Sequence, residues 1–96
     1  MKGGKTMKSL NIKIPLGVAQ LMDDNAQLNP DYITSFIVDH YNKSVNLNQP
    51  IGEMCYNYTF KIDDDLHKAI RLQAFELELP MNEMVGRMFS KYYKEV

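Results

Sequence analysis

Two short segments of the chain, residues 9–14 and 57–62, carry polar side chains at every second position. The two polar sets are Ser9, Asn11 and Lys13 in the first segment, and Asn57, Thr59 and Lys61 in the second. Their hydroxyl, amide and ammonium groups are hydrogen-bond donors, which makes them candidates for recognising a partner. Because successive side chains of a strand point to opposite faces, each segment predicts a half-buried strand with this polar set on its wet face.

The other reactive side chains do not indicate catalysis. His40, His67 and Cys55 are far apart in the sequence, at spacings that fit neither a metal site nor a nucleophile with its base. We therefore expect no catalytic residue, no metal, no cofactor and no enzymatic activity. A lone cysteine excludes an internal disulfide and is typical of a reducing compartment, so a cytoplasmic location is expected.

Chain length and charge further limit the class of protein that this sequence can be. The 96 residues, 45% of them hydrophobic, suffice for one core, and no apolar run is long enough for a membrane span. The net charge of -1 gives no global positive field. The N-terminus is the basic end, and residues 1–8, with Lys2, Lys5 and Lys8, are predicted to be a flexible basic arm.

The chain repeats one order of elements, because a helical pattern and then a second helical pattern follow each predicted strand. The predicted core stripes of the first copy are Val18, Leu21, Met22 and Leu28, then Ile33, Phe36, Ile37 and Tyr41. Those of the second copy are Leu66, Ala69, Ile70, Ala74 and Leu77, then Met84, Val85, Met88 and Tyr92.

Local signals mark where these elements begin. Pro15 ends the first strand, and the acidic run 63–65 supplies a cap and favourable charge at the next helix start. Asn29 is the expected cap of a helix whose first turn contains Pro30, and Pro80 starts the corresponding helix of the second copy.

One domain, residues 9–96, follows from this order, with a first copy at 9–42, a linker at 43–55 and a second copy at 56–96. A single copy buries too little surface to be stable, so the two are expected to pair. The predicted fold class is α+β and mostly helical, with two antiparallel strands covered by four helices and their polar faces open to solvent. Pairing with the strands of another chain is an alternative that the sequence leaves open.

The chain resembles the ribbon-helix-helix superfamily over residues 8–93. The resemblance rests on the alternating strands, on the helix after each, and on residues 79–85 (Leu-Pro-Met-Asn-Glu-Met-Val). This last stretch is similar to the family's turn into its second helix, where an apolar pair follows a small polar cap. Since family members usually act as dimers of one such unit, the chain resembles a dimer fused end to end.

The resemblance implies sequence-specific binding of double-stranded DNA, with the ribbon in the major groove. Carried over residue by residue, the base-facing positions are Ser9, Asn11, Lys13, Asn57, Thr59 and Lys61. Lys2, Lys5 and Lys8 can contact the phosphate backbone. A site that is an imperfect palindrome and a role as a transcriptional repressor or as a plasmid or phage accessory regulator are expected.

A second hypothesis is a protein-binding module, antitoxin-like or inhibitory, that keeps this fold without reading DNA. The net charge of -1 and the acidic residues at the helix starts, Asp31 and Glu83, favour it. Its discriminating features would be a ribbon without positive potential or an exposed apolar patch on the outer helices. The partner is then another protein or a second copy of the chain.

Overall fold

The computed structural model describes residues 6–43, 47, 52 and 54–93. In chain order the described elements are β1 (Met7–Pro15), α1 (Leu16–Asp24), α2 (Pro30–His40), the 3-10 helix η1 (Tyr41–Lys43), β2 (Cys55–Asp63), α3 (Asp64–Leu77) and α4 (Met81–Tyr92). The strands pair antiparallel in a two-stranded sheet. The predicted class is confirmed: the fold is α+β, mostly helical, with two antiparallel strands and four α-helices among the described residues.

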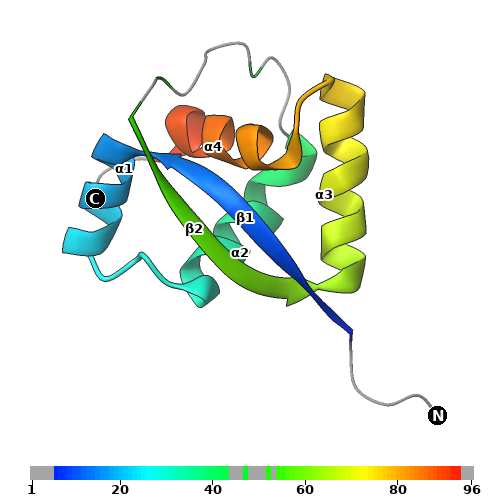
Figure 1. Cartoon of the computed structure of the whole chain (residues 1–96), viewed down its shortest axis with the longest axis horizontal. Coiled ribbons are helices and arrows are strands. Elements are labelled where there is room, and N and C mark those ends of the chain that lie inside the picture. Colours follow the sequence, from blue (N-terminus) through cyan, green and yellow to red (C-terminus); the bar gives the residue numbers. More distant parts are fainter. Residues whose placement is uncertain (1–5, 44–46, 48–51, 53, 94–96) are drawn as a thin grey trace.

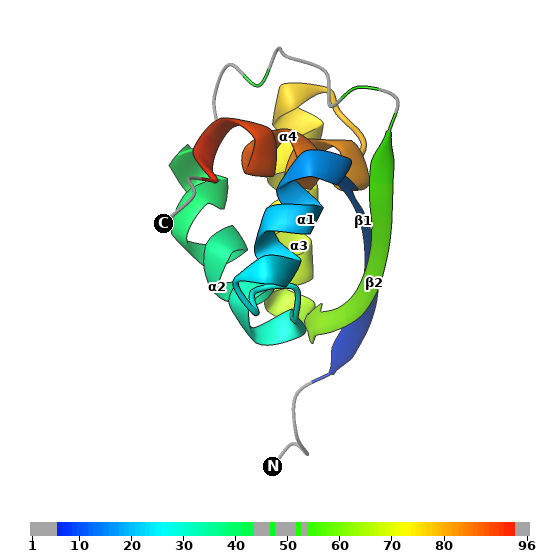
Figure 2. The same ribbon diagram turned by 90° about the vertical axis from the view of Figure 1, so that its left-hand side faces the viewer.

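The sheet and the helices form two layers. Figure 1 looks onto the two strands. Figure 2 shows the molecule turned by 90°, with the strands along one edge and all four α-helices to one side of them. The strand side chains that face the helices are almost all apolar. Those fully or nearly buried are Leu10, Ile12, Ile14, Phe60 and Ile62, and Tyr58 is half-buried. This burial confirms the predicted inner face of the ribbon and removes its apolar surface from water.

The predicted caps hold at two helices of the four. The Asn29 side chain accepts a hydrogen bond from the Tyr32 backbone N–H at 2.8 Å, and Pro30 is the first residue of α2. The Asp63 carboxylate accepts from the Asp65 backbone N–H at 3.1 Å at the start of α3. Each cap satisfies a backbone donor that has no partner within the helix. α4 begins directly after Pro80, as predicted, but Pro80 makes no side-chain cap bond there.

The core lies where α4 runs along β1. Met84, Val85, Met88 and Phe89 of α4 are fully buried, and the Phe89 ring stacks on Phe36 of α2 with 4.2 Å between centroids. The predicted stripes of both second helices are therefore buried except at their last positions, because Tyr41, which lies in η1, and Tyr92 are half-buried. Phe89 was not predicted.

The first helix of the first copy is shorter than its apolar spacing suggests. The prediction of Leu28 as a helical core position is wrong, because α1 ends at Asp24 and Ala26 takes a left-handed conformation (φ 59°) that a continuing helix cannot contain. Leu28 still packs against the core from the connection to α2.

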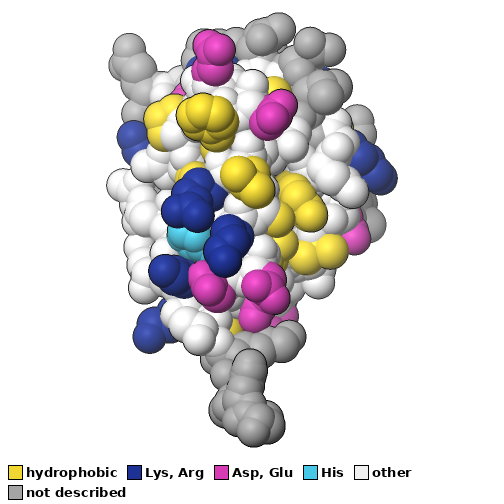
Figure 3. Space-filling view, turned by 90° about the vertical axis from the view of Figure 1, so that its right-hand side faces the viewer, with side chains coloured by type: hydrophobic (Ala, Val, Ile, Leu, Met, Phe, Trp, Pro, Cys, Tyr) yellow, Lys and Arg dark blue, Asp and Glu magenta, His cyan; other side chains and the backbone are white. Residues whose placement is uncertain are grey.

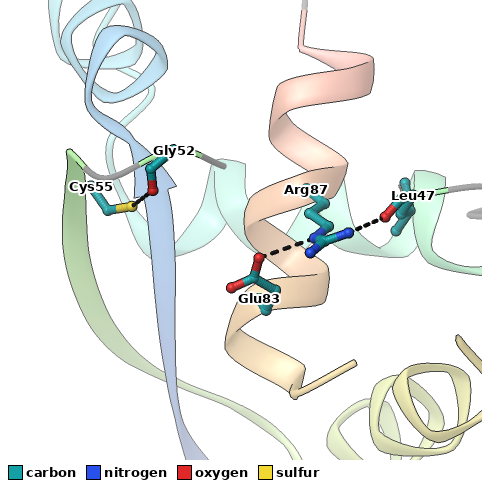
Figure 4. Close-up of polar contacts among 5 residues, drawn as sticks. All are labelled: Leu47, Gly52, Cys55, Glu83 and Arg87. Carbon is teal, nitrogen blue, oxygen red and sulfur yellow. Dashed lines mark hydrogen bonds and ion pairs between the residues drawn. The ribbon is translucent and has the colours of Figure 1, made fainter. Parts of the chain in front are cut away.

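Part of the predicted linker is fixed to the core. Leu47 is buried, and its carbonyl accepts a 2.6 Å hydrogen bond from Arg87 of α4, whose guanidinium also pairs with Glu83 at 3.0 Å (Figure 4). The two residues that bound the predicted linker, Lys43 and Cys55, belong to η1 and β2. The sequence between the copies lacks a period, so this anchor could not be read from it.

Candidate nucleic-acid interface

The outer face of the ribbon brings all six predicted base-facing residues together. The antiparallel register sets them in three cross-strand pairs: Ser9 opposite Lys61, Asn11 opposite Thr59, and Lys13 opposite Asn57. Five of these side chains are exposed, and Lys13 is half-buried. Of the described elements, every helix lies on the other side of the sheet, so this face is uncovered by them (Figure 2).

The central pair is joined across the strands, because the Asn11 amide donates a 2.6 Å hydrogen bond to the Thr59 hydroxyl oxygen. Cross-strand polar pairs of this kind stabilise a ribbon and hold both side chains in one orientation. The bond uses one amide hydrogen of Asn11, so its other amide hydrogen and its carbonyl oxygen stay available to a partner.

Local twofold pseudosymmetry relates the two ends of the outer face. With Asn11 and Thr59 at the centre, Lys13 lies toward one end and Lys61 toward the other, each opposite a small polar residue. Ammonium groups therefore occupy both halves of the face, although the residues beside them differ. This is the arrangement that the two repeated segments predict.

The outer face also extends beyond the predicted residues. Met7 and Asp63 form the next outward pair after Ser9 and Lys61, and Pro15 and Cys55 end the face at the other side. Asp63 brings a carboxylate close to Lys61, but this carboxylate is bonded to the start of α3. The period of two, followed for one more step in each segment, would have found this pair.

Lys8 is part of β1 and not of an arm, because the strand begins at Met7. Its register partner is Ile62, which places it on the helix side of the ribbon end, where its ammonium lies 3.9 Å from the Asp64 carboxylate. Lys2 and Lys5, the other two predicted phosphate contacts, lie outside the described residues.

An open hollow adjoins the Lys61 end of the ribbon. It is lined by residues of β1 and β2 and by the first turns of α2, namely Met7, Lys61, Ile62, Asp63, Pro30, Asp31, Thr34 and Ser35. The backbone donors at a helix start favour negative ligands, whereas the Asp31 and Asp63 carboxylates oppose them. This juxtaposition could not be predicted from the sequence, because it depends on how α2 packs against β2.

The reactive side chains considered for catalysis lie on three different elements. His40 of α2 stacks on Tyr92 and contacts the Phe36 ring and carbonyl, His67 is on α3, and Cys55 starts β2 with its sulfur 3.7 Å from the Gly52 carbonyl oxygen (Figure 4). Across the described ranges, no three His, Cys, Asp or Glu side chains are grouped so that they could hold a metal ion.

Among the described residues, no helix combines the length and the apolar character that a membrane span needs.

Comparisons with protein-family models, with curated proteins and with solved structures gave no match to this chain.

Proposed function

We propose that the chain is a tandem ribbon-helix-helix protein that binds double-stranded DNA by inserting the outer face of its ribbon into the major groove. One observation carries the proposal: the register gathers six hydrogen-bonding side chains on one uncovered face, in pairs about a local twofold. The major groove admits a two-stranded ribbon, and its base edges offer donors and acceptors to such side chains.

The side-chain chemistry suits base recognition. Lysine donates to guanine O6 and N7, asparagine pairs with the adenine edge, and serine or threonine bonds either kind of edge or touches a thymine methyl. Lys13 and Lys61 lie toward opposite ends of the ribbon, but the residues opposite them, Asn57 and Ser9, differ. A pseudo-twofold reader with unequal halves fits an imperfect palindrome.

Binding would depend on local charge, since the chain as a whole has a net charge of -1. Both ribbon lysines face outward, and Lys8 adds a partly engaged charge at one end. Release of counterions from the DNA would make the affinity fall as salt rises. Such a protein would act in the cytoplasm as a transcriptional repressor or as a plasmid or phage accessory regulator.

The proposal is tested by selection from random duplex DNA at two salt concentrations. The purified protein should enrich an imperfect palindrome that the variant with Asn11→Ala, Lys13→Ala, Thr59→Ala and Lys61→Ala does not retain. With the selected duplex, Lys13→Ala with Lys61→Ala should weaken binding at least tenfold and relax the preference at the base pairs that the two lysines contact, because each lost base contact is worth about 1–3 kcal/mol.

A matched control removes two lysines elsewhere. Lys43→Ala with Lys91→Ala changes the net charge equally but leaves the ribbon intact, so the selected sequence should stay the same. Absence of any enriched sequence, or equal loss of binding in both double-lysine variants, would refute base reading by the ribbon.

A protein-binding module remains the second candidate, because one outer helix exposes large apolar side chains. Phe75 and Leu72 of α3 are 80% and 62% exposed. Exposed apolar groups on an outer helix favour contact with protein, whether the ribbon reads DNA or not. The outer face of the ribbon is on the two strands, whereas Phe75 and Leu72 are on α3, so the two surfaces can bind two different partners.

A further inference from the structure

The outward side of α3 carries two large hydrophobic side chains that contribute little to the core. Phe75 and Leu72 are three residues apart, which makes them neighbours on the helix surface. They are the two most exposed large hydrophobic residues of the described helices. Apolar groups left together in water gain free energy when a second surface covers them.

Charged residues flank this pair on both sides. Lys68 and Arg71 precede it within α3, whereas Glu76 and the C-cap residue Glu78 follow it, and all four are exposed. We name these six residues, Lys68, Arg71, Leu72, Phe75, Glu76 and Glu78, the α3 surface. Figure 3 views the side of the molecule where α3 lies and shows hydrophobic side chains beside a group of Lys and Arg side chains, with acidic side chains nearby.

We propose that the α3 surface binds the α3 surface of a second copy of this chain, with the two helices antiparallel. A twofold axis between Leu72 and Phe75 would place the apolar pair of one copy on that of the other. The same operation sets Lys68 and Arg71 of each copy beside the acidic end of its partner. That end is also the negative end of the helix dipole, so the charges and the dipole agree.

Self-association fits this surface better than an unrelated partner does, because the surface is complementary to itself. A twofold contact of one patch with its own copy closes at two chains. The corresponding helix of the first repeat offers no second such patch, since its exposed residues in the structure are Gly17, Gln20, Asp23 and Asp24. The pair therefore stops at a dimer. Within one chain α3 lies beside the ribbon (Figure 1), so a contact through α3 would leave the outer face of the ribbon open in each copy.

Sedimentation equilibrium of the full chain over a wide range of protein concentration tests this pairing. The mass should rise from 11.1 kDa for one chain toward twice that value, and no further. Leu72→Ser with Phe75→Ser should raise the dimer dissociation constant roughly tenfold or more, because four apolar side chains leave the contact. Val38→Ser is the matched control, since Val38 is half exposed on α2 and its loss should leave the constant unchanged.

Charge reversal tests the antiparallel orientation. Arg71→Glu should weaken the dimer, and adding Glu78→Lys in the same chain should restore it, because each new charge then faces its opposite. Circular dichroism confirms that each variant is folded. A monomer at every concentration, assembly beyond two chains, a dimer indifferent to Leu72 and Phe75, or failure of the double charge variant to recover would each overturn the proposal.

Discussion

The strand-helix-helix order occurs twice in the chain, and the last helix of each copy differs in what it covers. α4 runs along β1, the strand of the other copy, and buries Met84, Val85, Gly86, Met88 and Phe89. α2 has far less contact with β2 and buries Ile33, Phe36 and Ile37. Equal patterns in the sequence have therefore produced unequal halves, in which the second copy supplies the helix at the centre of the core.

The N-terminal caps of these two helices differ the other way: the less buried helix has the side-chain cap. α2 has the side-chain cap of Asn29, whereas no described side chain caps α4 behind Pro80. The helix with less burial thus has the stronger local signal. Tertiary packing can hold a helix whose start is weak, while a helix at the margin of the core depends more on its own cap.

The largest change in the free energy of unfolding that this comparison predicts is for a substitution of Phe89. Phe89→Ala should lower the free energy of unfolding by about 3–5 kcal/mol, because it removes a fully buried ring that stacks on Phe36 and leaves a cavity. Denaturant unfolding followed by circular dichroism measures the change. Phe75→Ala, the same substitution at an exposed ring, should change the value of the dilute protein by no more than about 0.5 kcal/mol. Similar losses in the two variants would contradict the central place of α4.

A smaller effect is expected at the start of α2. Asn29→Ala should cost about 1 kcal/mol, since the Tyr32 backbone N–H loses its acceptor. Asn82→Ala, in the first turn of α4, should cost less than about 0.5 kcal/mol in the same denaturant titration. If the two asparagines contribute equally, the contrast between a capped and a packed helix does not hold.

The smallest effect is a pH dependence where the two copies meet. Burial raises the pKa of Tyr32 on α2 above its ordinary value of 10.0, and the charge of ionised Tyr93 raises it further. The folded protein then holds this proton more tightly than the unfolded chain does. The stabilisation is complete below about pH 10 and is lost as pH rises through the higher folded pKa.

Thermal unfolding on either side of pH 10 measures this loss of stability. Tyr32→Phe should lessen the alkaline loss of stability, because it deletes the titrating group. Tyr56→Phe is the control, since that side chain lies exposed at the end of the ribbon. If the wild-type protein and the Tyr32→Phe variant lose the same stability at alkaline pH, Tyr32 is not the source of that loss.

Local chemistry predicted much of the fold and of the ribbon. Alternation at 9–14 and 57–62 predicted both strands and their outward residues, because a period of two fixes which side chains share a face. A cap was predicted at Asn29 and within the acidic run 63–65, where Asp63 provides it, for an equally local reason: a short polar side chain satisfies a backbone donor two or three residues ahead.

The structural features that the sequence did not predict, or predicted wrongly, depend on contacts distant in sequence or on strained backbone. Phe89 is buried against Phe36 of the other copy, and Leu47 is held by Arg87, so neither follows from its own segment. Leu28 was misplaced because Ala26, a residue that disfavours the left-handed region, adopts it and ends the helical path. Glu78 does the same after α3, and so neither turn shows the glycine that usually marks a helix end.

Arg87 ties the segment between the copies to the helix that covers β1. This contact leaves two shorter connections in place of one long one. Because both strands belong to one chain, the second strand meets the first at a high effective concentration. The rate at which this chain folds should be independent of dilution, whereas two separate strand-helix-helix chains must first collide.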